Sequence, residues 1–381
     1  MSRESVKRER ITKRGIDYSL LVVVVFLIGF GLVMLYSSSY YTASIKFDDA
    51  AFFLKKQIVA TALSVVALVF FIVIDYRVWK KYTWILYIVS NLLILAVLTP
   101  IGMEANGARR WLDFGVITVQ PAEIAKIAVI MLMAAVLSTN IKKMQGLGSM
   151  LMVFVIALVP TGLVFVVTDN FSSAIIIAAI GVIMLIVACK NNKAFIALIV
   201  GLLAVAVIGL VLLGGFRATR ILVWLNPEQY ASEGGFQVLQ GLYAVGSGGL
   251  FGKGLGQSVQ KLGFVPEAQN DMIFTIVCEE LGLFGGIAVL ILFAFLIWRF
   301  MVIANNTDDL FGALVVVGVM AHIAVQVILN VAVVTGTVPN TGITLPFISY
   351  GGSSILFLMS EMGLVLSVSN HRRRKREAKI R

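Results

Sequence analysis

The chain has 381 residues, of which 59% are hydrophobic and 13% are charged, and its formal net charge is +11. A soluble domain of this length would carry roughly twice that share of charged residues, so the composition excludes an ordinary soluble protein and indicates a membrane protein. The positive charge fits membrane topology and anionic lipid head groups better than nucleic acid, and we expect no nucleic-acid partner.

Ten apolar segments are long enough to cross a bilayer, each needing roughly 20 residues as a helix. They lie at Tyr18–Tyr36, Ile58–Ile74, Thr83–Leu98, Ala122–Leu137, Met150–Val167, Phe171–Cys189, Ala194–Leu213, Met272–Phe300, Leu310–Val334 and Ser353–Val368. Helices are expected because lipid cannot satisfy backbone polar groups, and the alternation of barrel strands is missing. The sequence therefore predicts an all-α polytopic membrane protein. Residues 1–381 would form a single membrane domain, with a large extracytoplasmic loop, residues 214–270, between the seventh and eighth helices.

Lysine and arginine are distributed unevenly among the segments that flank these helices. They are concentrated in the N-terminal tail, residues 1–16, in the C-terminal tail, residues 370–381, and in the joining segments on the same side of the membrane. Since cytoplasmic segments carry the excess of positive charge, we expect both termini in the cytoplasm. The protein is predicted to cross the cytoplasmic membrane several times, and the even number of segments agrees with this orientation.

Strongly polar side chains are rare in the apolar segments, where such groups are usually functional or paired. They are Glu123 and Lys126 in the fourth segment, Glu279 and Glu280 in the eighth, His322, Gln326 and Asn330 in the ninth, and Glu361 in the tenth. We expect one of the two adjacent glutamates to pair with backbone and the other to face a neighbouring helix. His322 is more typical of a hydrogen-bonded contact between helices than of a proton relay.

Glu123 and Lys126 lie three residues apart and therefore on one face of their helix. Two interpretations are open. The pair can be an internal ion pair that neutralises itself and fixes packing. It can instead border a cavity near the outer leaflet, where it would hold an anionic substrate or position an acid.

Two outside loops carry further candidate residues. Arg109 and Arg110 precede Trp111 at the outer interface, where they would suit a phosphate-bearing lipid head group or simply form an interfacial belt. The segment Thr335–Ser354, which includes Ser349, is rich in hydroxyls, glycine and proline. It is apolar enough to re-enter the membrane, and non-helical backbone at that depth is tolerated where it lines a cavity. We expect it to form one wall of an outside-facing site.

The glycine-rich stretch from Gly246 to Gly256 excludes a regular helix there. Its Lys253 follows a glycine, but Gly254 occupies the position where a nucleotide-binding P-loop needs Ser or Thr. The stretch is either a flexible turn or a backbone-amide cradle for a diphosphate. Lys261 adds a second cation.

Asp271 stands where this outside loop becomes the eighth apolar segment, and Glu267 precedes it by one turn. An acid at that boundary can be an ordinary helix N-cap or a functional carboxylate. The residues alone leave both interpretations open.

Seven motifs, in order along the chain, resemble those of the SEDS family (shape, elongation, division and sporulation), whose members include FtsW, RodA and SpoVE. They begin at Tyr36 (YSSS), Gly107 (GARRW), Gln120 (QPAEIAK), Gly246 (GSGGLFGKG), Pro266 (PEAQNDMIF), Glu279 (EELG) and Leu345 (LPFISYGGSS). The PEA form of the acid motif and the tyrosine-serine motif are more similar to FtsW or SpoVE than to RodA. The sequence departs from the family at Gln269-Asn270, Met272 and Asn170, so any role of the family's acid at that last position is in doubt.

The resemblance implies a peptidoglycan glycosyltransferase that polymerises lipid II, an undecaprenyl diphosphate disaccharide-pentapeptide, outside the cytoplasmic membrane. It implies a class B penicillin-binding protein as partner, together with other membrane proteins of the division or elongation machinery. The family's essential aspartate falls on Asp271, the candidate base, and its Glu and Lys fall on Glu123 and Lys126.

Stabilising the leaving diphosphate would require cations. The candidates are Arg109, Arg110, Lys126, Lys253 and Lys261, with Glu267 and Ser349 as further substrate-binding candidates. No cofactor is implied with certainty, although a divalent cation, Mg²⁺ or Mn²⁺, could share this role. Two other functions stay open: a transporter that flips a lipid-linked precursor, and a non-enzymatic scaffold for cell-wall enzymes.

Overall fold

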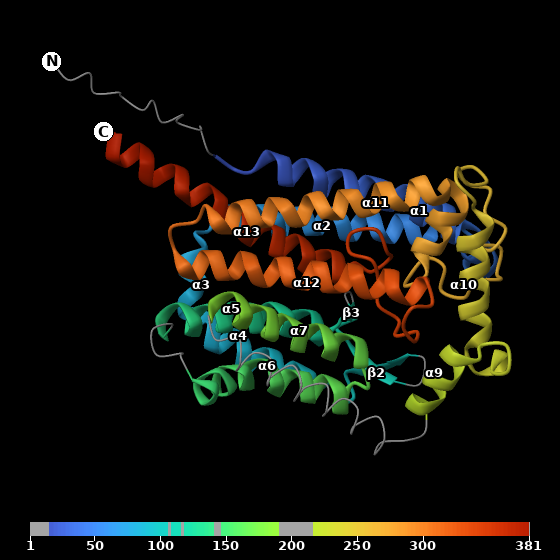
Figure 1. Cartoon of the computed structure of the whole chain (residues 1–381), viewed down its shortest axis with the longest axis horizontal. Coiled ribbons are helices and arrows are strands. Elements are labelled where there is room, and N and C mark those ends of the chain that lie inside the picture. The colour runs from blue at the N-terminus through green and yellow to red at the C-terminus, as the bar shows by residue number, and fades with distance from the viewer. Residues whose placement is uncertain (1–14, 106–107, 116–117, 141–145, 190–215, 381) are drawn as a thin grey trace.

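The computed structural model describes residues 15–105, 108–115, 118–140, 146–189 and 216–380. Within these ranges the chain forms a bundle of long helices lying side by side, with a small sheet and two shorter helices at one end (Figure 1). The elements are α1 (Tyr18–Phe47), α2 (Phe52–Val73), α3 (Tyr76–Trp79), η1 (Lys80–Tyr82), α4 (Thr83–Ala96), β1 (Gly102–Ala105), β2 (Ala108–Asp113), β3 (Thr118–Val119), α5 (Pro121–Asn140), α6 (Leu147–Val167), α7 (Phe171–Ala188), α9 (Phe216–Leu225), η3 (Ala231–Glu233), α10 (Gly235–Ser247), α11 (Ile273–Asn305), α12 (Leu310–Val334) and α13 (Gly352–Ile380). The start of α1 and the end of α13 lie together at the end of the bundle opposite the sheet (Figure 1).

Eight of the described helices are long and apolar enough to cross a membrane: α1, α2, α5, α6, α7, α11, α12 and α13. The predicted segment Thr83–Leu98 forms α4, whose 14 residues are fewer than a bilayer crossing usually needs. The predicted segment Ala194–Leu213 lies outside the described residues. The all-α polytopic architecture is therefore confirmed, and every predicted segment except Ala194–Leu213 corresponds to a described helix.

The loops contain more structure than the sequence predicted. The predicted loop 214–270 includes the helices α9 and α10, while from Gly248 to Met272 the chain forms turns, as the glycines indicate. The segment after α4 forms an antiparallel sheet in the order β1-β2-β3, with Gly102 opposite Leu112 and Leu112 opposite Val119. Strand pairing satisfies backbone groups that would otherwise be exposed at a membrane interface.

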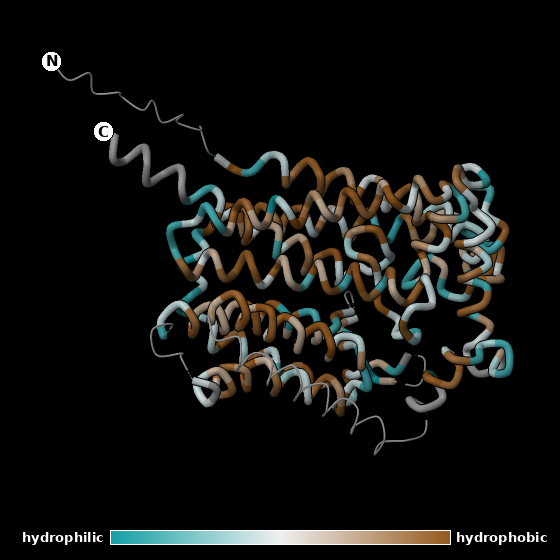
Figure 2. The backbone as a smooth tube through the Cα atoms, in the orientation of Figure 1, coloured by the Kyte–Doolittle hydropathy of each residue, from teal (hydrophilic) through white to brown (hydrophobic). Residues whose placement is uncertain are grey.

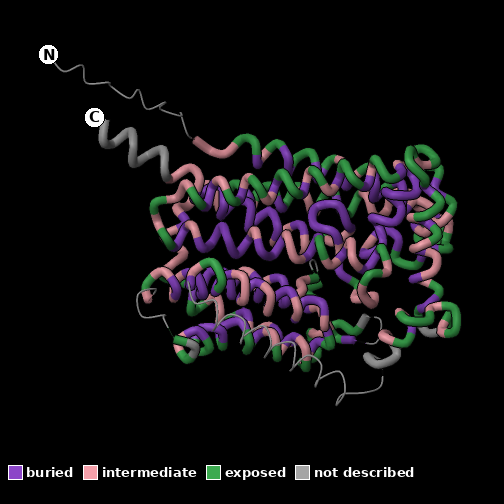
Figure 3. The backbone as a smooth tube through the Cα atoms, in the orientation of Figure 1, coloured by how far each residue is buried: buried purple, intermediate pink, exposed green. Residues whose placement is uncertain are grey.

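Hydrophobic residues run along the outer helices of the bundle as well as the inner ones (Figure 2). Val66 of α2, Ile88 of α4 and Ile291 of α11 are all more than half exposed. Figure 3 shows that buried positions are concentrated instead along α12 and the first half of α13. A bundle that is hydrophobic on both its inner and outer surfaces is what a lipid environment requires.

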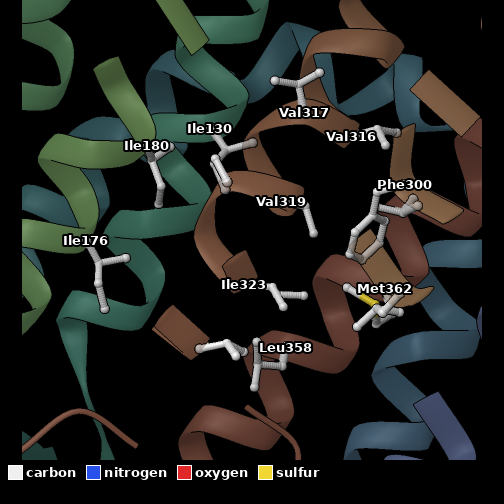
Figure 4. Close-up of a cluster of buried hydrophobic side chains, with 14 of the residues drawn as sticks. Ile130, Ile176, Ile180, Phe300, Val316, Val317, Val319, Ile323, Leu358 and Met362 are labelled. Atoms are coloured by element: carbon white, nitrogen blue, oxygen red, sulfur yellow. The ribbon is translucent and has the colours of Figure 1, made fainter. Parts of the chain in front are cut away.

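Helix α12 is the centre of the packing. It contacts α5, α7, α11 and α13. Figure 4 shows its side chains Val319 and Ile323 between Ile130 of α5 and Met362 of α13, with Val316 near Phe300 of α11. Since α12 is buried on most of its faces, its polar side chains must find partners inside the protein.

Helix α1 approaches the backbone of the segment that precedes α13. An ideal Cβ built on Gly31 would lie 2.6 Å from the carbonyl oxygen of Phe347 and 2.8 Å from the Cα of Ile348. Only glycine allows this contact, because backbone atoms cannot move aside as a flexible side chain can. The contact holds the segment 335–351 against the bundle.

We predict that Gly31→Ala lowers stability by about 1–3 kcal/mol, because the added methyl group overpacks a backbone contact. Gly29→Ala is the matched control on the same helix, since nothing lies within 4 Å of its ideal Cβ. Thermal unfolding of the purified variants in detergent measures both. Equal melting temperatures for the two variants would contradict the predicted close contact.

Candidate active site

A cavity of about 470 Å³ opens among the turns and helix ends near the small sheet. Polar and charged side chains dominate its lining: Arg110, Thr118, Gln120, Glu123, Lys126, Asn170, Ser172, Ser173, Glu267, Asn270, Asp271, Gln326, Thr341, Thr344, Tyr350, Ser353 and Ser354. The cavity lies at the end of the bundle opposite the start of α1 and the end of α13 (Figure 1).

Four helices begin around this cavity. Glu123 is the third residue of α5, Ser172 is the second of α7, and Ser353 is the second of α13, while Asp271 precedes α11 by two residues. Each helix start carries unpaired N–H groups and a partial positive charge. The arrangement therefore favours a negatively charged ligand.

Asp271 is buried and faces the cavity. Burial raises the pKa of its carboxyl to about 7, and the negative charge of Glu267 adds to the rise, against the opposing effects of nearby backbone N–H groups and Arg220. The N-cap of α11 is Met272, which makes no side-chain capping bond, so the N-cap interpretation of Asp271 is wrong. A carboxyl that is half ionised near neutral pH can exchange a proton with a ligand.

Glu123 and Lys126 form the ion pair of the first interpretation and also border a cavity, as the second one expects. The Lys126 ammonium lies 2.7 Å from Glu123 Oε1, and both side chains are buried. Both also line the cavity, and Glu123 Oε2 has no hydrogen-bond partner among the described residues. The pair is thus an internal ion pair with one free acceptor oxygen at the cavity wall.

The two neighbouring arginines lie in different environments. Arg110 lines the cavity, and its guanidinium donates to the carbonyl oxygens of Thr168 (3.3 Å) and Asp169 (2.9 Å). Arg109 does not line the cavity, because it pairs at the surface with Glu104, its partner across the β1–β2 ladder, at 3.6 Å. The structure thus separates Arg109 from Arg110 and from the other residues that line the cavity.

Lys253 and Lys261 are also absent from the cavity lining, because each is bound by a buried glutamate of α11. Lys253 lies 2.6 Å from Glu279, and Lys261 lies 2.7 Å from Glu280. The buried ammonium of Lys261 and the buried carboxylates of Glu279 and Glu280 require such partners to offset their lost hydration. The prediction that these two lysines contact substrate is therefore not supported by their positions.

The partners predicted for the adjacent glutamates are confirmed. Glu279 accepts hydrogen bonds from the backbone N–H groups of Val259 and Gln260, and Glu280 accepts one from the hydroxyl of Ser37 on the neighbouring helix α1. The lysine partners were not predicted, because Lys253 and Lys261 are distant from the glutamates in sequence.

The glycine-rich stretch packs against α11 and does not form a cradle for a ligand. An ideal Cβ on Gly248 would lie 2.0 Å from the carbonyl oxygen of Cys278, and one on Gly252 would lie 2.2 Å from that of Glu280. The N–H groups of Lys253 and Gly254 donate to the carbonyls of Glu279 and Glu280. Since these amides are already used and the stretch does not line the cavity, the structure gives no support to its interpretation as a diphosphate cradle.

The segment Thr335–Ser354 forms a non-helical wall of the cavity, as predicted, up to the start of α13 at Gly352. Ser349 itself does not line the cavity, since its buried hydroxyl accepts a hydrogen bond from the Leu345 N–H at 2.8 Å. Its position makes it a support of the wall and not a ligand contact.

His322 forms the predicted contact between helices. Its Nδ1 lies 2.9 Å from a carboxylate oxygen of Glu361 on α13, and its Nε2 lies 2.9 Å from Gln326. Gln326 also lines the cavity and donates to the carbonyl oxygen of Thr344. Gln326 was not among the predicted site residues, although an amide in an apolar run was the signal that could have identified it.

Asn170, Ser172 and Ser173 were likewise missed as site residues. They line the cavity at the start of α7, and Asn170 caps that helix by accepting from the Ser173 N–H. The polar run after the fifth apolar segment was visible in the sequence, but nothing local placed it beside Asp271.

Comparison with known proteins assigns the chain to a family. A family model described as "Cell cycle protein", for FtsW, RodA and SpoVE, matches residues 18–374. The chain is 40% identical over 369 residues to stage V sporulation protein E of Bacillus subtilis (strain 168), covering 95% of this chain and 99% of that protein. The chain belongs to the FtsW/RodA/SpoVE family. It is also 38% identical over 355 residues to a probable peptidoglycan glycosyltransferase FtsW of Trichlorobacter lovleyi, covering 93% of each.

Solved structures show that the fold is also that of the family. A chain from a study of how a peptidoglycan synthase complex coordinates polymerization and crosslinking aligns with a TM-score of 0.76 and 26% identity, over 93% of this chain and 98% of that one. The rod shape determining protein RodA of Thermus thermophilus aligns with a TM-score of 0.70 and 25% identity, over 93% and 97%. The resemblance inferred from the seven motifs is confirmed.

In the part of the chain that the structure describes, no group of three or more His, Cys, Asp or Glu side chains could hold a metal ion. Although Glu123, Glu267 and Asp271 all line the cavity, they do not form such a group. A divalent cation at this family's site therefore stays a prediction from the sequence.

The buried pair Lys261–Glu280 generates a stability prediction. Lys261→Met should lower stability by about 3–5 kcal/mol, because it leaves the fully buried Glu280 carboxylate without its cation. The double variant Lys261→Met with Glu280→Gln should recover much of the loss, since no unpaired charge remains. Thermal unfolding in detergent measures both. A single variant as stable as the unmodified protein would show that the pair does not form.

Proposed function

We propose that this chain is a peptidoglycan glycosyltransferase that polymerises lipid II into β-1,4-linked glycan strands during wall synthesis for division, sporulation or elongation. The observation that carries the proposal is the buried carboxyl of Asp271, whose pKa is raised to about 7. It lies at the wall of a cavity that is also lined by the cationic side chains of Arg110 and Lys126. The names of the FtsW relatives support the same activity.

In the proposed reaction Asp271 acts as general base. Its carboxylate takes the proton of the acceptor sugar's 4-hydroxyl while that oxygen forms a bond to the anomeric carbon of the donor. The bond between that carbon and the diphosphate oxygen breaks, and undecaprenyl diphosphate leaves with the electron pair. Attack from the face opposite the leaving group converts the α-linked donor into a β-linked product. General base catalysis of this kind typically contributes about 10²–10⁴-fold.

Arg110 and Lys126 are the cations best placed to stabilise the leaving diphosphate. Both line the cavity with Asp271, and four helix N-termini add partial positive charge. The unpartnered Oε2 of Glu123 is suited to accept a hydrogen bond from a sugar hydroxyl. Glu267 acts indirectly, because its negative charge helps keep the Asp271 pKa high.

The arrangement of the bundle supports an outward-facing site, and a similar solved structure supports a partner. The cavity lies at the end of the bundle opposite the start of α1 and the end of α13. In the sequence, basic tails adjoin both of these helix ends, and positive tails favour the cytoplasm, so the site would face outward. The similar chain from a peptidoglycan synthase complex that couples polymerization to crosslinking supports a class B penicillin-binding protein as partner.

The first prediction from the proposed function concerns Asp271. Asp271→Asn should lower the rate of glycan polymerisation at least 100-fold, since a general base of this kind contributes about 10²–10⁴-fold. In the unmodified protein the rate should fall as pH drops through about 7, because protonation of Asp271 removes the base. The measurement is the rate at which the purified protein, with its partner, makes glycan strands from lipid II at a series of pH values.

Asp113→Asn is the matched control, since Asp113 is exposed at the end of β2 and does not line the cavity. Detergent removes membrane sidedness, so polymer formed there cannot arise from lipid flipping. Normal polymerisation by Asp271→Asn would rule out the base role. Absence of polymer from the unmodified complex would favour transport or a scaffold.

The second prediction separates the adjacent arginines. Arg110→Met should lower polymerisation about 10-fold to 100-fold, because a hydrogen bond to a charged group is worth about 1.5–3 kcal/mol. Arg109→Met should have little effect, because Arg109 lies at the surface beside Glu104. The same polymerisation assay compares them. A larger effect of Arg109→Met would place the leaving group outside the cavity.

A further inference from the structure

The position of Asp271 depends on a residue of the central helix. Asn330 of α12 is fully buried, and its side-chain amide donates two hydrogen bonds. One goes to the backbone carbonyl oxygen of Asp271 at 2.8 Å, and the other goes to that of Ile343 at 2.6 Å. One amide nitrogen therefore joins the segment that carries the carboxyl to the wall of the cavity.

The wall held in this way packs against the Asp271 carboxyl itself. Gly342, next to Ile343, has φ of 69°, and its ideal Cβ would lie 3.8 Å from Asp271 Oδ2. A second link runs in parallel, from the Tyr350 N–H to the carbonyl oxygen of Gln269 at 2.9 Å. The segment 269–271 and the segment 342–350 are thus fastened to each other and to α12.

The chemistry at position 330 explains why an amide is needed there. Two carbonyl oxygens require two N–H donors on one short side chain, and a primary amide supplies both. The Oδ1 of Asn330 is buried without a hydrogen-bond partner in the described part of the chain. A buried unpaired acceptor is unfavourable, so the gain at Asn330 must come from its two donors.

We propose that Asn330 is the positioning residue of Asp271, fixing the backbone of the catalytic segment and of the opposing cavity wall with a single amide group. The proposal rests on the proposed function, in which Asp271 is the base. Asn330 touches no substrate, since it does not line the cavity. It acts through the placement of the carboxyl.

The test compares Asn330→Leu, which keeps the approximate volume and removes both donors, with Asn330→Ser, which keeps one hydroxyl donor. Asn91→Leu is the matched control, because the Asn91 amide donates only to Tyr87 of its own helix and Asn91 does not line the cavity. The readouts are kcat and KM for polymerisation, the pH dependence of kcat, and modification of Asp271 by a carbodiimide with mass spectrometry.

We expect Asn330→Leu to lower kcat about 10-fold to 100-fold while KM changes little, since a misplacement of about 1 Å can cost 10²-fold in rate. The acidic limb of the pH profile should move to lower pH, and carbodiimide modification should increase, because a loosened carboxyl is better hydrated. Asn330→Ser should fall between Asn330→Leu and the unmodified protein. Asn91→Leu should leave the pH limb and the modification unchanged.

Three results would overturn the proposal. Asn330→Leu could keep the kcat and pH profile of the unmodified protein. It could instead lose kcat with no change in the pH limb or in Asp271 modification, which would indicate a merely structural role. If Asn330→Leu does not fold, an Asn330→Ser variant whose acidic pH limb and Asp271 modification match those of the unmodified protein would refute the positioning role. Asp271→Asn in the same assay distinguishes failure of the proposed function from failure of the positioning role. An active Asp271→Asn variant refutes the base role of Asp271. An inactive Asp271→Asn variant leaves only the positioning role of Asn330 in question.

Discussion

The structure depends on one constraint, which is that a charge removed from water inside a membrane protein needs a partner. Lys126, Lys253 and Lys261 each lie within 2.7 Å of a glutamate oxygen. The Lys126 pair lies within α5 at the cavity wall, whereas the Lys253 and Lys261 pairs fasten the turns that follow α10 to α11. The desolvation of an ammonium or a carboxylate costs several kcal/mol, so the two pairs with α11 also specify which segments can lie together.

Asp271 differs from these paired groups. No ion pair holds its carboxyl among the described residues, and burial raises its pKa to about 7. The surrounding protein holds it through its backbone, where Asn330 and the turn at Gly342 leave the carboxyl little freedom. A carboxyl that is fixed in position but not neutralised by a cation is available to take a proton, which is the property that the proposed reaction requires.

The candidate site was partly predictable, and the errors have a common cause. Glu123 and Lys126 are three residues apart on one helix, so their pairing follows from helical geometry. Arg109, Lys253 and Lys261 were chosen for their charge and their place in outside loops. Their charge gave no indication that they would form ion pairs with Glu104, Glu279 and Glu280 and would not face the cavity. Those partners are set by how loops fold back onto helices.

The sequence by itself determined the membrane class, the position of the long helices and the acid at the start of α11, because hydropathy and helix length are local properties. Its seven ordered motifs also determined the family. Only the tertiary structure decided which polar groups meet. Gln326, Asn170 and Asp271 line one cavity because α7, α11 and α12 bring together residues that lie far apart in the chain. Contacts of that kind depend on packing between helices, which no local pattern encodes.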